Sequence, residues 1–249
     1  MGDRDHRHDA IIALSQNEYR DAGDAYTLAG YGRLSGLSDR GRELFDPEDA
    51  PWAGYALESF FLAAICYRLS DGEARARNRV GQGILIASDL RDNILETPVL
   101  AAACDEWIGT FRAIAGDDDR AATAYDRAVK GYEDADPDDP VSVTTEPLLQ
   151  ATESGVRQLT RPNDENVKWD NIHGSAPEQA LSHRVQFFRS RVPTAIQSRI
   201  NEQTLHAPRG STEYGNDEFH CPDCGSHDVN YVADTVLCLR CDSPTERRS

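Results

Sequence analysis

The feature that most constrains this chain is a pair of CxxC motifs near its C-terminal end. The two motifs supply four cysteines: Cys221, Cys224, Cys238 and Cys241. Each motif can place two thiolates on one side of a tight turn. In the first motif Pro222 fixes a backbone dihedral, and Gly225 permits the turn that follows. Four sulfur atoms that converge in this way can surround one metal ion tetrahedrally.

The segment between the motifs favours β-strands, with Val229, Tyr231 and Val236 among its residues. This layout resembles a zinc ribbon, in which two strands bring two CPxCG-type knuckles together. The resemblance implies one Zn²⁺ held by all four cysteines. Because thiolates fill every coordination position, such a site is structural and does not activate water.

Two other uses of the four cysteines compete with zinc. Two disulfides require an oxidising compartment, but the chain opens MGDRDHRHDAIIAL, which lacks the apolar core of a secretion signal. Iron is the other competitor, since rubredoxins use similar knuckles, but the aromatic packing typical of rubredoxins is thin here. His220 and His227 flank the first knuckle, and we expect them to be solvated loop residues and not ligands.

The charge balance points to a salt-rich environment. The chain has 43 acidic and 26 basic residues, a net charge of -17, and lysine only at Lys130 and Lys168. This composition resembles that of cytoplasmic proteins from halophilic archaea. At molar salt the Debye length is only about 3 Å, so the repulsion among carboxylates is screened. We therefore expect a cytoplasmic protein, and no stretch approaches the roughly 18 apolar residues of a membrane span.

Residues 1–160 have the periodicity of amphipathic helices. Small and aromatic residues recur at helical spacing in 10–36 and 52–70, and further helices are expected near 73–94, 99–115, 120–135 and 146–159. Short connections between long helices favour antiparallel neighbours. The fold class predicted is mainly α, an antiparallel helical-repeat solenoid followed by a small C-terminal β zinc ribbon.

One stretch of this region resembles a tetratricopeptide repeat. In IGTFRAIAGDDDRAATAYDRAVKGYEDA, Ile108 and Gly109 match the large-then-small pair of the first helix, and Ala121, Tyr125 and Ala128 match the series of the second. The match is partial, and AGDAY in a long helix is similar to the SNAP-type branch of the family. The resemblance implies that small residues let two helices approach while Tyr125 fills the groove, and that the body binds a protein partner.

The segment 179–201 is an exception to the acidic composition. Its apolar residues recur at helical spacing, it contains Pro193, and it has no acidic residue. Its basic residues are candidate contacts for an anionic partner: Arg184, Arg189, Arg191 and Arg199. Three interpretations stay open, namely ion pairs with acidic helices of the same chain, contact with nucleic acid, and contact with an acidic protein or a second copy.

The expected organisation follows from these patterns. Residues 1–160 form the helical-repeat domain, 161–205 an irregular segment and the arginine-rich helix, 206–218 a flexible linker, 219–243 the zinc ribbon and 244–249 a tail. The linker is predicted from its glycine, proline and serine content.

The sequence offers little support for catalysis. It contains no GxxxxGK[ST], HExxH or GxSxG motif, and His173 has no partner at a defined spacing. We therefore expect a non-catalytic adaptor that binds a protein through its helical body, with the zinc ribbon as a second contact. The alternatives are a nucleic-acid- or ribosome-associated factor that docks through the arginine-rich helix and the ribbon, and a self-assembling structural protein.

Overall fold

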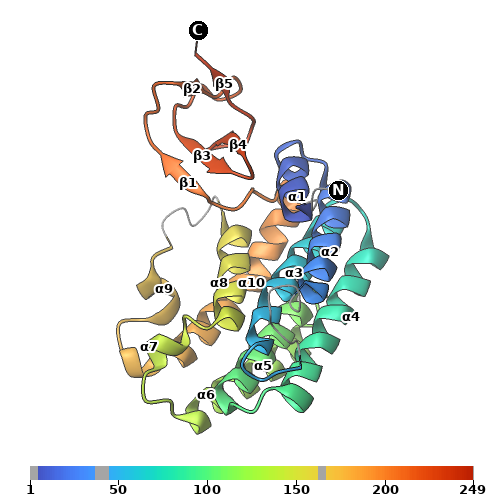
Figure 1. Cartoon of the computed structure of the whole chain (residues 1–249), viewed down its shortest axis with the longest axis vertical. Coiled ribbons are helices and arrows are strands. Elements are labelled where there is room, and N and C mark those ends of the chain that lie inside the picture. The colour runs from blue at the N-terminus through green and yellow to red at the C-terminus, as the bar shows by residue number, and fades with distance from the viewer. Residues whose placement is uncertain (1–4, 37–44, 162–166, 249) are drawn as a thin grey trace.

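The computed structural model describes residues 5–36, 45–161 and 167–248, which form a helical body with a small β unit at one end (Figure 1). The first part of the body contains α1 (His6–Ser15), α2 (Tyr19–Ser35), η2 (Ala50–Ala53), α3 (Gly54–Leu69), α4 (Glu73–Asp89), η3 (Leu90–Ile94), α5 (Pro98–Ile114) and α6 (Asp118–Ala135). The second part contains α7 (Pro140–Val143), α8 (Pro147–Thr160), α9 (Trp169–His173), η4 (Pro177–Gln179) and α10 (Ala180–Glu202). The predicted mainly helical fold is confirmed. Among the described residues, no helix has the length and apolar composition needed to cross a bilayer.

The first helical segment expected from the sequence is divided into two helices at Asn17. Asn17 has a φ of 59°, in the left-handed region that asparagine tolerates better than most residues. The Tyr19 hydroxyl donates a hydrogen bond to Asn17 Oδ1 at 2.8 Å, and Glu18 N–H donates to the carbonyl of Ala13 at 2.9 Å. Apolar periodicity does not reveal this break, because both helices contribute buried residues to the core.

Successive helices approach closely where a glycine on one faces an aromatic ring on the next. A Cβ atom added to Gly109 of α5 would lie 2.8 Å from Tyr125 Cδ1 of α6. One added to Gly30 of α2 would lie 2.7 Å from Phe60 Cε1 of α3. Both separations are well inside the 3.5–4.0 Å at which carbon atoms normally pack. The contact between Gly109 and Tyr125 is the one that the repeat-like pattern predicted.

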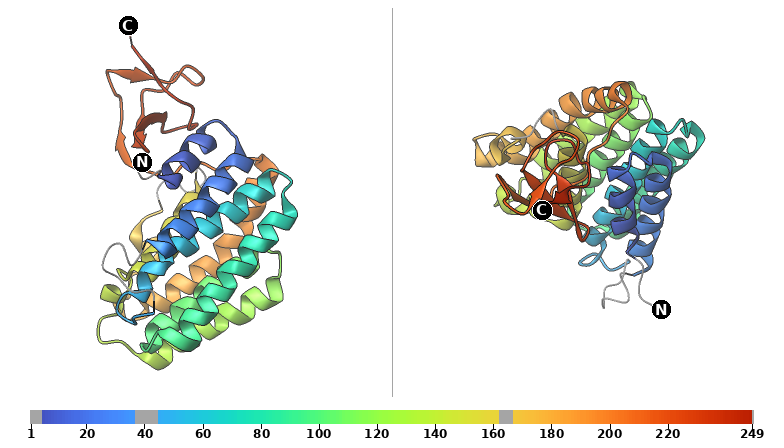
Figure 2. Two further views of the ribbon diagram at one scale, coloured as in Figure 1. Left: turned by 45° about the vertical axis from the view of Figure 1, so that its right-hand side comes forward. Right: turned by 90° about the horizontal axis from the view of Figure 1, so that it is seen from above.

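Two later helices pack across this row of hairpins (Figure 2). α8 contacts α3 and α5, and α10 contacts α3, α5, α6 and α8. At the centre, the Trp107 indole donates a hydrogen bond to the carbonyl of Leu148 at 3.0 Å and packs against Phe61 and Phe111. In a solenoid each repeat contacts only its neighbours, so a solenoid arrangement stays a prediction.

The β unit contains two small antiparallel sheets. In the first, β1 (Ser211–Glu213), β3 (Val229–Val232) and β4 (Thr235–Cys238) lie in the order β1-β3-β4. In the second, β2 (Phe219–His220) pairs with β5 (Glu246–Arg247). β3 and β4 are joined by Ala233 and Asp234, whose φ values of 50° and 49° are those of a two-residue hairpin turn.

The boundaries of the β unit differ from those expected. The segment 206–218, predicted to be a flexible linker, contributes β1 and contains buried Ala207 and Pro208. A Cβ atom at Gly210 would overlap the carbonyl oxygen of Tyr231, so this glycine permits close backbone packing. The predicted tail contributes β5. Residues 162–166 of the expected irregular segment and the last residue of the tail lie outside the described residues.

Helix α4 provides a matched test of the glycine contacts. A side chain at Gly83 would overlap the buried ring of Phe111, whereas one at Gly81 would meet nothing within 4 Å. We expect Gly83→Ala to lower the free energy of unfolding by roughly 1–3 kcal/mol. We expect Gly81→Ala to raise it by about 0.5–1 kcal/mol, because alanine favours a helix. Thermal and denaturant unfolding measure both effects. Two variants of equal stability would contradict the close packing of Gly83 against the Phe111 ring.

Candidate metal centre

The two CxxC motifs form two turns with the same backbone hydrogen bonds. Cys221 N–H donates to the carbonyl of Ser226, and Cys238 N–H donates to the carbonyl of Ser243, both at 2.8 Å. Gly225 N–H closes the first turn on the Cys221 carbonyl at 3.0 Å. The corresponding bond of the second turn joins residue 242 to Cys238 at 2.9 Å. The repeated geometry brings both pairs of thiols to one place.

The four sulfur atoms are spaced for one tetrahedral ion. The Sγ atoms of Cys221 and Cys241 are 3.5 Å apart, as are those of Cys224 and Cys238, and all four lie within 4.8 Å of one another. Four sulfurs at the usual Zn–S distance of 2.3 Å would be about 3.8 Å apart. A disulfide needs about 2.05 Å, and all six cysteines of the chain are free thiols. The four cysteines can therefore hold a metal ion, consistent with a zinc site.

The surroundings of the sulfur atoms suit thiolates when a cation balances their charge. Backbone N–H groups of Cys224 and Arg240 point to the Sγ atoms of Cys221 and Cys238 at 3.5 Å and 3.4 Å. Burial raises the pKa of the Cys238 thiol, an effect that a bound cation would oppose by stabilising the thiolate. His227 lies outside the four-sulfur cluster, and its ring contacts the carbonyl of Phe219 at 3.3 Å.

Asp242 attaches the second turn to the helical body. It occupies the position that Gly225 has in the first turn, and its φ is 61°. Its buried carboxylate accepts hydrogen bonds from the backbone N–H of Ala207 at 2.9 Å and from His206 Nδ1 at 2.6 Å. Arg161, which follows α8, reaches the same carboxylate at 3.4 Å and also donates to the carbonyl of Ala207. One side chain of the candidate metal centre thus connects it to two segments of the body.

An apolar contact supports the same junction. Ile11 of α1, Ala207 and Leu237 of β4 are fully buried against one another, with Val232 and Ala233 packed beside them. The hairpin turn of the β unit therefore lies against α1, as Figure 1 also shows. These contacts explain why the segment 206–218 is not a flexible tether.

The arginine-rich helix does not present its four arginines on one surface. Arg184 is completely buried, with its guanidinium group against both carboxylate oxygens of Glu106 at 2.9–3.1 Å. It also reaches Glu153 at 3.3 Å and donates to the carbonyl of Leu149 at 2.6 Å. Although burial alone would lower the pKa of Arg184, Glu106 raises it overall. Arg184 is therefore part of the interior.

Of the other three arginines, one is buried and two are exposed. Arg199 is buried and donates to the carbonyl of Arg161 at 2.6 Å. Arg189 is exposed and pairs with Asp126 at 2.5 Å, and Arg191 is exposed beside Phe187. Only Arg189 and Arg191 are thus placed to meet a partner.

The helical spacing of the sequence contains the signal that separates the four arginines. Arg184 lies three residues after Leu181 and four before Phe188, both on the buried face, and Arg199 lies three residues after Ile196. This spacing places Arg184 and Arg199 on the same face as the apolar residues.

His173, which was expected in a loop, lies in α9 and belongs to this buried network. Its ring stacks on Trp169 with centroids 4.5 Å apart, and its Nε2 lies 3.5 Å from Glu153. Burial, and next the charge of Arg184, lower the pKa of His173 to about 4. Its imidazole is therefore neutral at pH 7 and serves packing in α9.

Comparison with known proteins gives no match to a family model, a curated protein or a solved structure.

The metal content of single-cysteine variants tests the metal site directly. We expect purified protein to carry about one zinc ion per chain, as four thiolate ligands imply. Cys238→Ser removes a buried ligand, so its metal content should fall steeply, whereas Cys104→Ala changes a buried cysteine of α5 and should retain the ion. Elemental analysis of the three proteins measures this. Equal metal content in all three, or iron in place of zinc, would contradict the assignment.

Proposed function

We propose that this chain is a non-catalytic adaptor that binds a protein partner through its helical body, with a zinc ribbon as a second contact. Four thiolates would complete the coordination of zinc, which leaves no position for a substrate. The connection through Asp242 supports a ribbon held in one orientation on the body. A preorganised surface of this kind loses less entropy on binding than two modules on a flexible tether.

The observation that carries the proposal is an exposed apolar patch on α2 and α4. Leu28 and Tyr31 of α2 are 50% and 42% exposed, and Leu85 of α4 is 70% exposed. Arg79 and Gln82 of α4 donate hydrogen bonds to the Tyr31 hydroxyl, which fixes the ring between the two helices. Leu28 lies three residues before Tyr31 and Leu85 three residues after Gln82, so these exposed side chains border this contact. Exposed apolar side chains of this kind are typical of protein interaction sites.

Two features support the family and habitat suggested by the sequence. The contact of Gly109 with Tyr125 is what a tetratricopeptide-like hairpin requires, and the contact of Gly23 with Tyr67 repeats it between α2 and α3. The net charge of -17 supports a protein of a salt-accumulating cytoplasm, as in halophilic archaea. The nucleic-acid alternative has weaker support, since the arginine-rich helix exposes only Arg189 and Arg191.

The proposal is tested by affinity capture in molar KCl from an extract of a halophilic archaeon. We expect Leu28→Asp combined with Leu85→Asp to abolish capture of a specific protein, because charges would enter the apolar patch. Phe45→Asp changes an exposed aromatic residue outside α2 and α4, and should retain the partner. Tyr214→Ser, in the β unit, measures the contribution of the second contact.

Three outcomes would contradict the adaptor function. If the wild type and the Leu28/Leu85 double variant capture the same proteins, the patch does not bind the partner. Recovery of nucleic acid that is lost on combining Arg189→Glu with Arg191→Glu would favour the nucleic-acid alternative. A concentration-dependent assembly of the purified chain, disrupted by the patch variants, would favour self-association.

A further inference from the structure

A pocket lies at the junction between the helical body and the β unit. Its volume is about 580 Å³. Its walls come from α8, from the turn before α8, from Arg7 of α1 and Trp169 of α9, and from Arg209 in the segment that enters the β unit. This volume falls within the range of about 300–1,000 Å³ that is usual for small-molecule sites.

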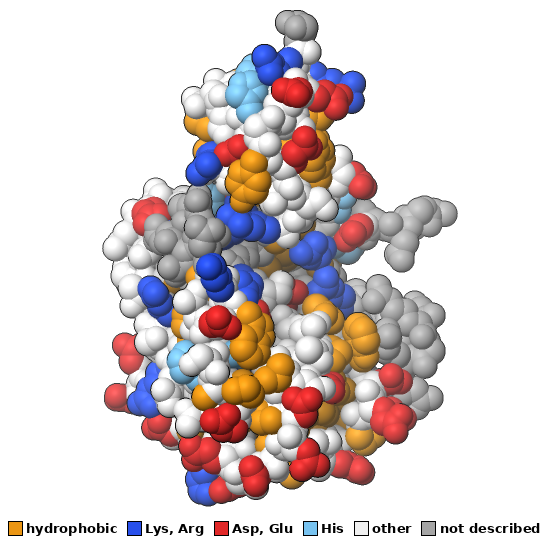
Figure 3. Space-filling model, turned by 90° about the vertical axis from the view of Figure 1, so that its left-hand side faces the viewer, with side chains coloured by type: hydrophobic (Ala, Val, Ile, Leu, Met, Phe, Trp, Pro, Cys, Tyr) orange, Lys and Arg blue, Asp and Glu red, His pale blue; other side chains and the backbone are white. Residues whose placement is uncertain are grey.

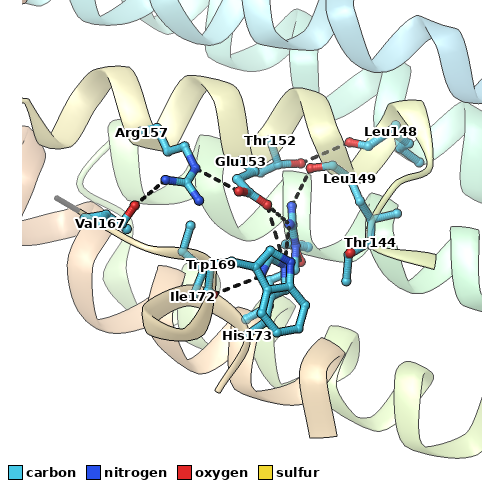
Figure 4. A network of polar contacts seen from close by, with 12 residues as sticks. Thr144, Leu148, Leu149, Thr152, Glu153, Arg157, Val167, Trp169, Ile172 and His173 are labelled. Carbon is cyan, nitrogen blue, oxygen red and sulfur yellow. Dashed lines mark hydrogen bonds and ion pairs between the residues drawn. The ribbon is translucent and has the colours of Figure 1, made fainter. Parts of the chain in front are cut away.

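The pocket is basic, although the chain as a whole is strongly acidic. Four arginines line it: Arg7, Arg157, Arg161 and Arg209. Figure 3 shows basic side chains gathered around the waist between the β unit and the body, whereas acidic side chains are most numerous at the end of the body away from the β unit. The one carboxylate of the lining is Glu153. It is already balanced by Arg157 at 2.8 Å, as Figure 4 shows, and by buried Arg184 at 3.3 Å.

Arg157 and Arg161 are engaged by other groups of the protein, whereas Arg7 and Arg209 have N–H groups that can donate to a ligand. Arg157 is held by Glu153 and by the carbonyl of Val167, and Arg161 binds the residues that attach the β unit. Among the described residues, neither Arg7 nor Arg209 makes a side-chain ion pair, and Arg209 is exposed. Their guanidinium groups can therefore form paired hydrogen bonds with an oxyanion such as phosphate.

The rest of the lining suits the organic part of a ligand. Trp169 is 38% exposed, and His173 stacks on it and fixes its ring. Tyr55 lies in the same lining, and its hydroxyl donates to Gln150 at 3.3 Å. The volume is much larger than a free phosphate ion needs, and aromatic side chains favour a planar ring.

We propose that this junction pocket binds a small organic phosphate with an aromatic ring, of the kind represented by a nucleoside monophosphate. Arg7 and Arg209 bind the phosphate, and Trp169 and the partly exposed Tyr55 contact the ring. Screening at molar salt weakens exposed charge pairs most, while hydrogen bonds in a concave site are less affected. Because Arg161 belongs both to this pocket and to the anchor of the β unit, an occupied pocket also strengthens the junction. The site is separate from the patch on α2 and α4.

Isothermal titration calorimetry of the full-length, zinc-loaded protein in molar KCl tests the proposal. The probes are AMP, UMP, adenosine and inorganic phosphate. We expect AMP or UMP to bind more tightly than either adenosine or phosphate, because only the nucleotides engage both parts of the pocket. Arg7→Gln and Arg209→Gln should each weaken this binding about tenfold or more, since each removes charge-assisted hydrogen bonds. Arg77→Gln, an exposed arginine of α4 outside the pocket, should leave binding unchanged.

A second variant guards against misfolding as the cause of lost binding. Gln150→Glu keeps the shape of an exposed side chain in the lining and adds a negative charge, so it should also weaken binding. Circular dichroism and zinc content confirm that each variant is folded. The proposal is overturned if neither nucleotide binds, if phosphate binds as tightly as the nucleotides, or if the Arg7, Arg209 and Gln150 variants bind like the wild type. Binding of a single-stranded oligonucleotide without binding of AMP or UMP would also overturn it.

Discussion

The structure depends most on the carboxylate of Asp242, where the metal-binding turn meets the helical body. Both Asp242 and Arg161 are more than nine-tenths buried, and their side chains lie 3.4 Å apart. Backbone N–H of Ala207 and the ring of His206 complete the hydrogen bonds of that carboxylate. Removal of one partner from a buried charge pair leaves the other uncompensated, at a cost of about 3–5 kcal/mol. The position of the β unit therefore rests on this cluster together with the Ile11 contact.

Several features follow from this junction. The backbone N–H of Asp242 closes the second turn on Cys238, so the residue that anchors the junction also belongs to the turn of Cys238 and Cys241. The pocket exists because the segment carrying Arg209 passes beside α8 on its way to β1. The position of the β unit and the basic pocket are thus consequences of one attachment, which also reaches the candidate metal centre. A flexible tether would have coupled none of them.

Local spacing in the sequence predicted much of this, and long-range contacts account for what it missed. The CxxC spacing predicted the four cysteines that the structure brings together, and the pattern around Gly109 predicted its contact with Tyr125. The burial of Arg184 depends on Glu106, which lies 78 residues earlier, so no local pattern could reveal its ion pair. The segment 206–218 was predicted to be a linker from its glycine and proline content. That content does not distinguish a linker from a packed segment, because both residues serve close packing as well as flexibility.

The most direct test of a single coupled unit is hydrogen–deuterium exchange of the zinc-loaded protein and of the same protein after chelation. If the junction is as described, chelation will remove protection from residues 206–247 and also from the C-terminal turn of α8 and from α1, while α3 to α5 stay protected. Loss of protection confined to residues 219–243 would show instead that the β unit is an independent module, and would contradict the account.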